Sequence, residues 1–172
     1  MITLYLARHG QTEENLNRIF QGHLPGTLTE TGKCQAKEMG RKLKDISLDA
    51  IISSDLKRVT DTVSLAVGYR ELPWEQTPLL REIDWGSWTG LSLNSVELNN
   101  PPADAETREM LYARAGRFLD YLKQHYEGKR VLVVAHGQIN RSIEAHILGI
   151  KADALRSIGH MQNAEVRRFE IM

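Results

Sequence analysis

Apolar positions along the chain follow two alternating spacings, and together these predict an alternation of strands and helices. Short apolar runs predict four strands, at residues 2–7, 49–53, 131–135 and 165–171. The continuous run VLVVA at 131–135 is typical of a strand buried on both faces of a parallel sheet. The charged run EVRRFEI at 165–171 instead predicts an edge strand, where solvent on one side tolerates Arg and Glu.

Helical spacing of apolar residues fills the intervals between these strands. It predicts helices over residues 30–45, after the N-cap candidates Ser53, Ser54 and Asp55, near 106–126, and directly after the third strand. Strands that alternate with helices form right-handed crossovers. The sequence therefore predicts an α/β fold, a three-layer sandwich with a mostly parallel sheet and helices on both faces.

Length and charge narrow the class of protein. A chain of 172 residues is expected to form a single domain, residues 1–172, that needs no disulfide or structural metal. Its 22 basic residues balance 22 acidic ones, so we expect no nucleic-acid or membrane partner. The single cysteine, Cys34, excludes CxxC motifs. The first apolar run ends at Arg8 and is too short for a signal peptide, so we expect a cytoplasmic protein.

Polar residues of similar chemistry follow the ends of three predicted strands. Arg8 and His9 follow the first strand, Arg58 lies one turn into the helix after the second, and His136 and Gly137 follow the third. Ligands of parallel α/β sheets bind beyond the carboxyl ends of the strands, so these residues are expected to converge. A lone histidine or arginine is most often a surface residue. Here two histidines each follow a strand and precede a glycine. This favours a ligand-binding site over two surface residues, because glycine lets a ligand approach the backbone.

Two arginines and two imidazoles suit a phosphate dianion. Guanidinium forks bind phosphate oxygens bidentately, and helix N-termini add N–H donors. Zinc on His9, His136 and a carboxylate is the weaker alternative, because two guanidinium groups would oppose a cation, and no metal is expected. The nucleotide motifs GxxxxGK[ST] and GxGxxG are absent, as is the GxSxG elbow of serine hydrolases.

An imidazole poised at a phosphate is a candidate nucleophile, and neighbouring arginines are expected to lower its pKa and keep its lone pair free. The leaving alkoxide then needs a proton. Glu82 and Asp84, in the segment LREIDWGSW at 80–88, are the candidate donors, and residue chemistry alone does not choose between them. Both can also be read as ordinary loop charges, with Trp85 and Trp88 packed in the core.

The pattern resembles the histidine phosphatase superfamily, the phosphoglycerate mutase-like proteins. LARHGQTEEN at 6–15 is similar to the family's RHGxTxxN signature, and SSDLKR at 53–58 is similar to its second block. LREIDWGSWTG at 80–90, VVAHG at 133–137 and QNAEVRRFE at 162–170 resemble the later blocks, in the family's order. The resemblance spans nearly the whole chain and implies the phosphoglycerate mutase-like fold.

This resemblance implies a role for each matched position. His9 takes the place of the phosphorylated nucleophile, and Glu82, rather than Asp84, that of the proton donor. The residues implied to bind the phosphate are Arg8, Asn15, Arg58, His136 and Gly137. The residues expected at the substrate rim are Gln21, His23, Trp85, Arg108 and Gln138, where Arg108 either meets a second anionic group or is simply solvated. The implied reaction is a ping-pong transfer through phosphohistidine to water, with no cofactor.

The expected function is that of a phosphomonoester phosphatase acting on a small phosphorylated metabolite, such as α-ribazole phosphate or a sugar phosphate. A short cap near 91–105 should leave the phosphohistidine open to water, which favours hydrolysis over intramolecular transfer. Two alternatives are a 2,3-bisphosphoglycerate-dependent mutase of the same family and a non-catalytic phosphate-binding regulatory module. A protein phosphohistidine also stays open as the substrate.

Overall fold

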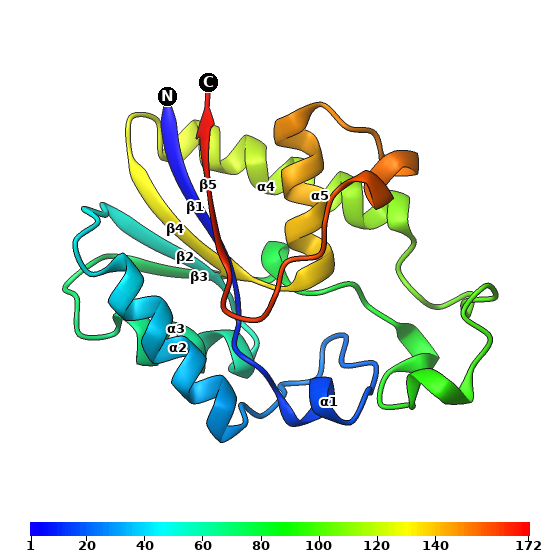
Figure 1. The fold of residues 1–172 in the computed structure, drawn as a ribbon. Helices are drawn as coiled ribbons and strands as arrows, with labels where there is room; N and C mark the ends of the chain where they lie inside the picture. The colour runs from blue at the N-terminus through cyan, green and yellow to red at the C-terminus, as the bar shows by residue number, and fades with distance from the viewer.

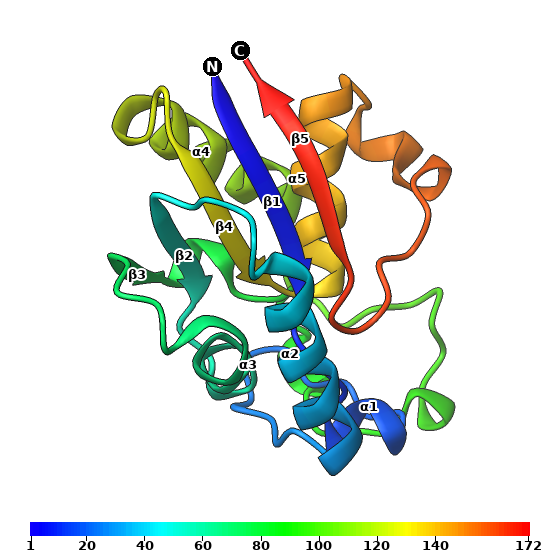
Figure 2. The ribbon, with the colours of Figure 1, turned by 60° about the vertical axis from the view of Figure 1, so that its left-hand side comes forward.

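A five-stranded sheet forms the centre of the molecule in a computed structural model that describes all 172 residues. Its strands are β1 (Ile2–Arg8), β2 (Ala50–Ser54), β3 (Trp74–Thr77), β4 (Arg130–Ala135) and β5 (Val166–Ile171). They lie in the order β3-β2-β4-β1-β5 (Figure 1). The first four are parallel, and β5 runs antiparallel to β1 at the edge (Figure 2). The expected mostly parallel sheet and its charged edge strand are confirmed.

Helices cover both faces of this sheet. One face carries α2 (Glu30–Leu43) and α3 (Lys57–Val67), and the other carries α4 (Arg108–His125) and α5 (Gly137–Leu148) (Figure 1). The shorter elements are α1 (Glu13–Leu16) and four 3-10 helices, η1 (Pro78–Leu80), η2 (Gly86–Trp88), η3 (Leu93–Ser95) and η4 (Ala152–Ser157). The three-layer sandwich is therefore confirmed. None of the helices combines the length and apolar character needed to cross a bilayer.

The two cores on either side of the sheet explain its apolar runs. In β1, Leu4 and Leu6 join Phe118 of α4 in the larger cluster, whereas Ala7 points the other way and joins Met39 of α2. Successive side chains of a strand point to opposite faces, so a strand covered on both faces must be apolar throughout. The same holds for β4, where each residue of VLVVA is fully buried.

The structure corrects the sequence prediction at two places. Strand β3 (Trp74–Thr77) was not predicted, because its sequence WEQT contains no fully buried side chain and lies at the edge of the sheet. The second correction concerns the start of α3, since Ser53 and Ser54 are the last residues of β2. The N-cap is Leu56, which has no side-chain cap, and its N–H donates to the Ser54 hydroxyl at 3.2 Å.

Candidate active site

The carboxyl ends of β1, β2 and β4 bring most of the predicted site residues to one cavity of about 160 Å³. The predicted residues that line it are Arg8, His9, Asn15, Gln21, Arg58, Glu82, Trp85 and Gln138. His136 is fully buried next to the cavity, and its ring meets that of His9 edge to face, with centroids 5.2 Å apart. The two strand-end histidines therefore form one unit.

Two glycines allow the chain after β1 to turn against the start of α2. A Cβ atom on Gly10 would lie 2.4 Å from the carbonyl oxygen of Gly32, and one on Gly32 would lie 2.0 Å from that of Gln11. No other residue fits at either position without moving the backbone. His9 is further held because its N–H donates to the Ala135 carbonyl oxygen at 3.1 Å. The loop that carries His9 is thus fixed on both sides.

The hydrogen bond of the His9 ring defines its tautomer. Nδ1 lies 2.7 Å from the carbonyl oxygen of Gly10, which can only accept, so Nδ1 carries the proton. Nε2 has no protein partner and holds the free lone pair. Burial, followed by the charges of Arg58 and Arg8, holds the pKa of His9 well below its usual range. The sequence predicts that the arginines lower this pKa, and the structure adds burial as the larger cause.

His136 is fixed in the same tautomer as His9. Its Nε2 lies 2.8 Å from the Ser54 hydroxyl, whose oxygen already accepts from the Leu56 N–H and whose hydrogen has no other acceptor. Ser54 therefore donates to Nε2, and Nδ1 carries the proton. Burial, then Arg58, holds the pKa of His136 well below its usual range. In the sequence Ser54 is only an N-cap candidate, and nothing local pairs it with His136.

The two arginines also donate to backbone carbonyl oxygens. Nη1 of Arg8 donates to the Met161 carbonyl oxygen at 2.9 Å. In Arg58, Nη2 donates to the Gly22 carbonyl oxygen at 2.9 Å and Nη1 donates to that of Leu24. Each terminal nitrogen of Arg58, whose guanidinium is expected to bind phosphate, therefore uses one of its two N–H groups on the backbone and keeps the other. Burial lowers the pKa of Arg58 to about 10, so the side chain stays charged at neutral pH.

Three buried N–H donors at the site have no partner. They are Nε of Arg8, Nε of Arg58 and Nδ1 of His136, which come from β1, α3 and the end of β4. A buried donor without an acceptor is costly, so unpaired donors in one place require an explanation. A bound group rich in acceptor oxygens and carrying negative charge would satisfy all three. Gly137 leaves room beside them, since a Cβ atom there would lie 3.4 Å from Nε of Arg8.

Asn15 and Gln21 reach the cavity from the first loop. Asn15 forms a capping box with Thr12, in which the Thr12 N–H donates to Oδ1 of Asn15 at 3.1 Å. Oδ1 also accepts from Asn163 at 3.4 Å. The amide Nδ2 of Asn15 is left to donate into the cavity. Gln21 is buried, and its Oε1 accepts from the Thr12 hydroxyl at 3.1 Å.

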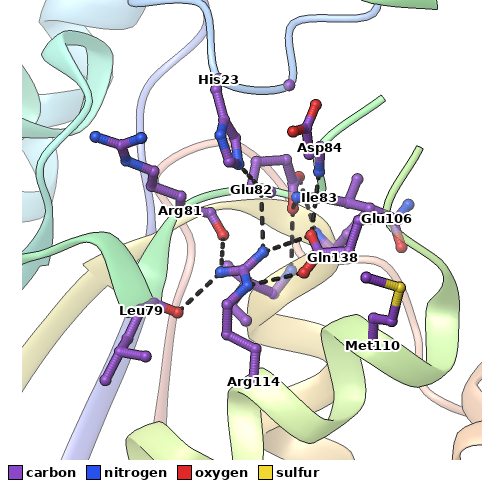
Figure 3. A network of polar contacts seen from close by, with 12 residues as sticks. His23, Leu79, Arg81, Glu82, Ile83, Asp84, Glu106, Met110, Arg114 and Gln138 are labelled. Atoms are coloured by element: carbon purple, nitrogen blue, oxygen red, sulfur yellow. Dashed lines mark hydrogen bonds and ion pairs between the residues drawn. The ribbon is translucent and has the colours of Figure 1, made fainter. Parts of the chain in front are cut away.

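The carboxylate of Glu82 lies on the N-terminus of α5 (Figure 3). It accepts from the N–H groups of Gln138 and Ile139 at 3.0 and 3.1 Å, and from that of Ile83 at 3.0 Å. His136 is the N-cap of α5 but supplies no side-chain cap, so Glu82 provides the acceptor from a distant part of the chain. The proton-donor candidate and the second histidine thus meet at one helix end.

Asp84 and His23 lie away from the cavity. The Asp84 carboxylate accepts from the Gly86 N–H at 2.9 Å, and both Asp84 and His23 line a separate surface cavity. Nε2 of His23 donates to the carbonyl oxygen of Glu82 at 2.9 Å. Of the two candidate proton donors, Glu82 therefore lines the phosphate-sized cavity and Asp84 does not. It places His23 behind Glu82 rather than at the rim where it was expected.

A second cavity of about 470 Å³ adjoins the first and shares Trp85 and Gln138 with it. Its lining is mixed: the apolar part includes Trp88, Leu98, Pro101, Pro102 and Leu155, and Glu106 and Glu109 belong to the polar part. Arg108 lines it as well, with an exposed side chain that has no protein partner. Trp85 packs on Phe20 with ring centroids 4.8 Å apart, and Phe20 stacks on Trp88 at 5.1 Å.

Backbone hydrogen bonds join the first loop to the residues after η2. Phe20 donates to Leu91 at 3.0 Å and accepts from Gly90 at 2.8 Å, while Leu93 donates to Arg18 at 2.9 Å. Phe20 and Leu93 both line the smaller cavity. The start of segment 91–105 is therefore a fixed wall of the site.

The fold and this site define an enzyme of the α/β class that handles phosphate esters. The chain belongs to the histidine phosphatase superfamily, branch 1, whose family model matches residues 4–172. An uncharacterized phosphatase, PhoE of Bacillus subtilis, is 35% identical over 152 residues, which cover 87% of this chain and 79% of that protein. Relatives named as phosphatases place the chain among the phosphatase hydrolases of this family.

The chain is also similar to a phosphatase with a named substrate, to a solved structure and to relatives named as mutases. The adenosylcobalamin/alpha-ribazole phosphatase of Escherichia coli is 28% identical over 166 residues, covering 88% of this chain and 82% of that protein. The solved structure of Bacillus stearothermophilus YhfR superposes with a TM-score of 0.94 at 29% identity, covering 100% of this chain and 92% of that one. Relatives named as phosphoglycerate mutases also match.

Proposed function

We propose that this enzyme hydrolyses phosphomonoesters through a phosphohistidine formed on His9. The observation that carries the proposal is the free Nε2 of His9, at a cavity beside three buried and unpaired N–H donors. A neutral imidazole with a fixed lone pair is a nucleophile at neutral pH. Donors that are already in place cost no reorganisation when charge develops on the phosphoryl group.

In the first step, Nε2 of His9 attacks phosphorus and the bond from phosphorus to the ester oxygen breaks. Glu82, in its protonated form, gives its proton to the leaving oxygen, so the product departs as an alcohol. The Nδ1–H of His9 keeps its hydrogen bond to the Gly10 carbonyl, which stabilises the positive charge on the phosphorylated ring. Arg8, Arg58 and His136 donate to the phosphoryl oxygens.

In the second step, water replaces the departed alcohol. The Glu82 carboxylate takes a proton from this water, its oxygen attacks phosphorus, and the phosphorus–nitrogen bond breaks. Free phosphate leaves, His9 regains its lone pair, and Glu82 is again protonated. The three N–H groups that hold the carboxylate fix its position for this step.

The substrate we propose is a small phosphorylated metabolite whose organic part occupies the second cavity. That cavity adjoins the phosphate-sized one at Trp85 and Gln138, and the apolar part of its lining suits a ring system. Arg108 at its edge suits a further polar or anionic group on the same molecule. Both α-ribazole phosphate and sugar phosphates fit this description, and the indole rings of Trp85 and Trp88 in the lining favour the former.

We also propose that the protein works in the cytoplasm. Its one cysteine, Cys34, is exposed and unpaired, which suits a reducing compartment. Fractionation of cells that produce the protein from its own gene would test this, and recovery outside the cytoplasmic fraction would contradict it.

The experiment that tests the phosphatase mechanism is acid-quenched intact mass spectrometry during turnover of 4-nitrophenyl phosphate in EDTA. The wild type should carry one phosphate adduct, and His9→Gln should lack it and lose about a thousandfold or more in turnover. His125→Gln, an exposed histidine on α4, is the matched control and should behave as the wild type.

Three other outcomes would point elsewhere. Loss of turnover in EDTA would support the alternative in which His9, His136 and a carboxylate bind zinc. Activity only after addition of a bisphosphate primer would identify a mutase. Phosphate binding without an adduct or turnover would indicate a non-catalytic module. A screen of phosphorylated metabolites, with α-ribazole phosphate and sugar phosphates side by side, would then compare kcat/KM for the proposed substrates.

A further inference from the structure

One buried arginine outside the cavity holds the backbone that carries Glu82. Arg114 lies on α4, with 11% of its side chain exposed. Its Nη1 donates to the carbonyl oxygens of Leu79 and Arg81 at 2.9 and 2.6 Å (Figure 3). Its Nη2 donates to the carbonyl oxygen of Glu82 at 3.2 Å. Three carbonyl groups within residues 79–82 therefore point at one guanidinium.

Glu106 fixes this guanidinium from the other side. Its Oε2 accepts from Nε of Arg114 at 2.9 Å, and its Oε1 accepts from Nη2 at 2.7 Å. Oε1 also accepts from the Asp84 N–H at 3.1 Å, so the pair holds the segment beyond Glu82 as well. A guanidinium has five N–H donors, and these contacts use all five. A lysine could not reproduce them.

The two ends of Glu82 are thus held independently. Its backbone is held by Arg114 and by His23, and its carboxylate is held by the N-terminus of α5. Arg114 does not line the phosphate-sized cavity, so any effect on the reaction acts through Glu82. Displacements of about 1 Å at a reacting group can cost about a hundredfold in rate.

We propose that Arg114, held by Glu106, is a positioning residue that aims Glu82 at the leaving oxygen. The inference rests on the proposed function, in which Glu82 protonates that oxygen. A buried ion pair is poor evidence for stability alone, because apolar replacements are often neutral. Here three donors of Arg114 are directed to the segment that carries the proton donor and the other two bind Glu106, which favours a role in positioning.

Leaving-group dependence separates positioning from a purely structural role. 4-Nitrophenolate departs without help from an acid, whereas 4-methoxyphenolate and alkoxides need a proton. A misplaced Glu82 should therefore steepen the dependence of kcat/KM on leaving-group basicity. Partial unfolding or loss of active enzyme would lower kcat/KM by the same factor for every substrate.

The experiment measures kcat/KM for para-substituted aryl phosphates, from nitro to methoxy. Arg114→Met should lose about 10-fold to 100-fold on the methoxy substrate and only a few-fold on the nitro substrate. Arg117→Met, an exposed arginine one turn along α4, should stay within about twofold on both. The double variant Arg114→Met with Glu106→Gln leaves no buried uncompensated carboxylate, so it guards against loss of fold. Thermal unfolding confirms that each variant is folded.

Equal losses on the two substrates in the folded double variant would overturn the inference. Failure of the proposed function itself has a different signature, which Glu82→Gln provides. If Glu82→Gln keeps the wild-type leaving-group dependence, Glu82 is not the proton donor, and the proposed function and this inference both fail. If Glu82→Gln steepens the dependence and Arg114→Met does not, only the inference fails.

Discussion

The imidazoles of His9 and His136 lie edge to face, with ring centroids 5.2 Å apart, and 2% and 0% of these residues are exposed. Each ring has a single fixed tautomer, His9 through the Gly10 carbonyl and His136 through the Ser54 hydroxyl. Both pKa values are lowered, first by burial and then by Arg58. The pair is therefore neutral at the pH at which it would bind a phosphate ester.

This neutrality predicts a loss of stability in acid. The unfolded chain takes up protons on these histidines below their ordinary pKa of 6.5, and the folded chain does not. Stability is thus fully present above pH 6.5 and falls as the pH falls, by up to about 1.4 kcal/mol per histidine per pH unit. Urea unfolding at pH 7.5, 6.5 and 5.5 measures the slope.

A matched pair of variants isolates the contribution of the site. His9→Gln should reduce the slope of the free energy of unfolding against pH by the contribution of one histidine. His125→Gln, on the exposed face of α4, should leave this slope as in the wild type. Parallel slopes for wild type and His9→Gln would show that His9 is not held neutral.

Ser54 should set the protonation pattern of His136. In Ser54→Ala, Nε2 of His136 loses its donor, and the ring can carry its proton on Nε2 instead. We expect a changed tautomer in the ¹⁵N spectrum of His136 and a loss of about 10-fold to 100-fold in kcat, as for other partners of site histidines. Ser53→Ala is the control, since Ser53 is equally buried but bonds Trp74. Normal tautomer and normal kcat in Ser54→Ala would refute this role.

Gly10 should tolerate no side chain. A Cβ atom at 2.4 Å from the Gly32 carbonyl oxygen meets backbone that cannot rotate away. Gly10→Ala should lower the free energy of unfolding by about 1–3 kcal/mol and reduce kcat, because His9 moves with the loop. Gly159→Ala, where a Cβ atom would meet nothing within 4 Å, should leave both unchanged. Chemical denaturation and steady-state kinetics check both variants.

Phosphate binding should stabilise the fold through the unpaired donors. At about a hundredfold excess over Kd, inorganic phosphate should add about 2.7 kcal/mol to the free energy of unfolding and raise Tm by several degrees. Arg8→Met should lose this shift. Arg70→Met is the control, because Arg70, like Arg8, donates to backbone carbonyl oxygens but lies outside the cavity. An unchanged shift in Arg8→Met would place the phosphate elsewhere.

Hydrophobic periodicity predicted the buried part of the fold well. The run at 131–135 is apolar throughout and that at 2–7 is apolar except for Thr3, because both faces of β1 and β4 are covered. Strand β3 was not predicted, because a four-residue strand at the edge of a sheet folds without a pattern of buried apolar residues. The start of α3 was misplaced because Ser53 and Ser54 look like caps, although they lie inside β2 and point toward groups from distant segments.

The site was predictable where its residues follow strand ends. Topology alone brings the ends of parallel strands together, so Arg8, His9 and His136 could be grouped before any coordinates. The supporting contacts could not, because they join residues far apart in the chain. Ser54 bonds His136, the Glu82 carboxylate caps α5, and Arg114 holds residues 79–82 through backbone carbonyls. Hydrogen bonds to backbone carbonyls leave no signature in side-chain identity.

The aromatic cluster of Phe20, Trp85 and Trp88 gives the protein an intrinsic fluorescence signal for ligand binding. Two of its three tryptophans belong to this cluster, and Trp85 lines both cavities. The third, Trp74, lies on β3 and gives a constant background. A ligand entering either cavity changes the surroundings of Trp85 directly. Binding of a non-absorbing metabolite can therefore be followed by intrinsic fluorescence, without a label and without turnover.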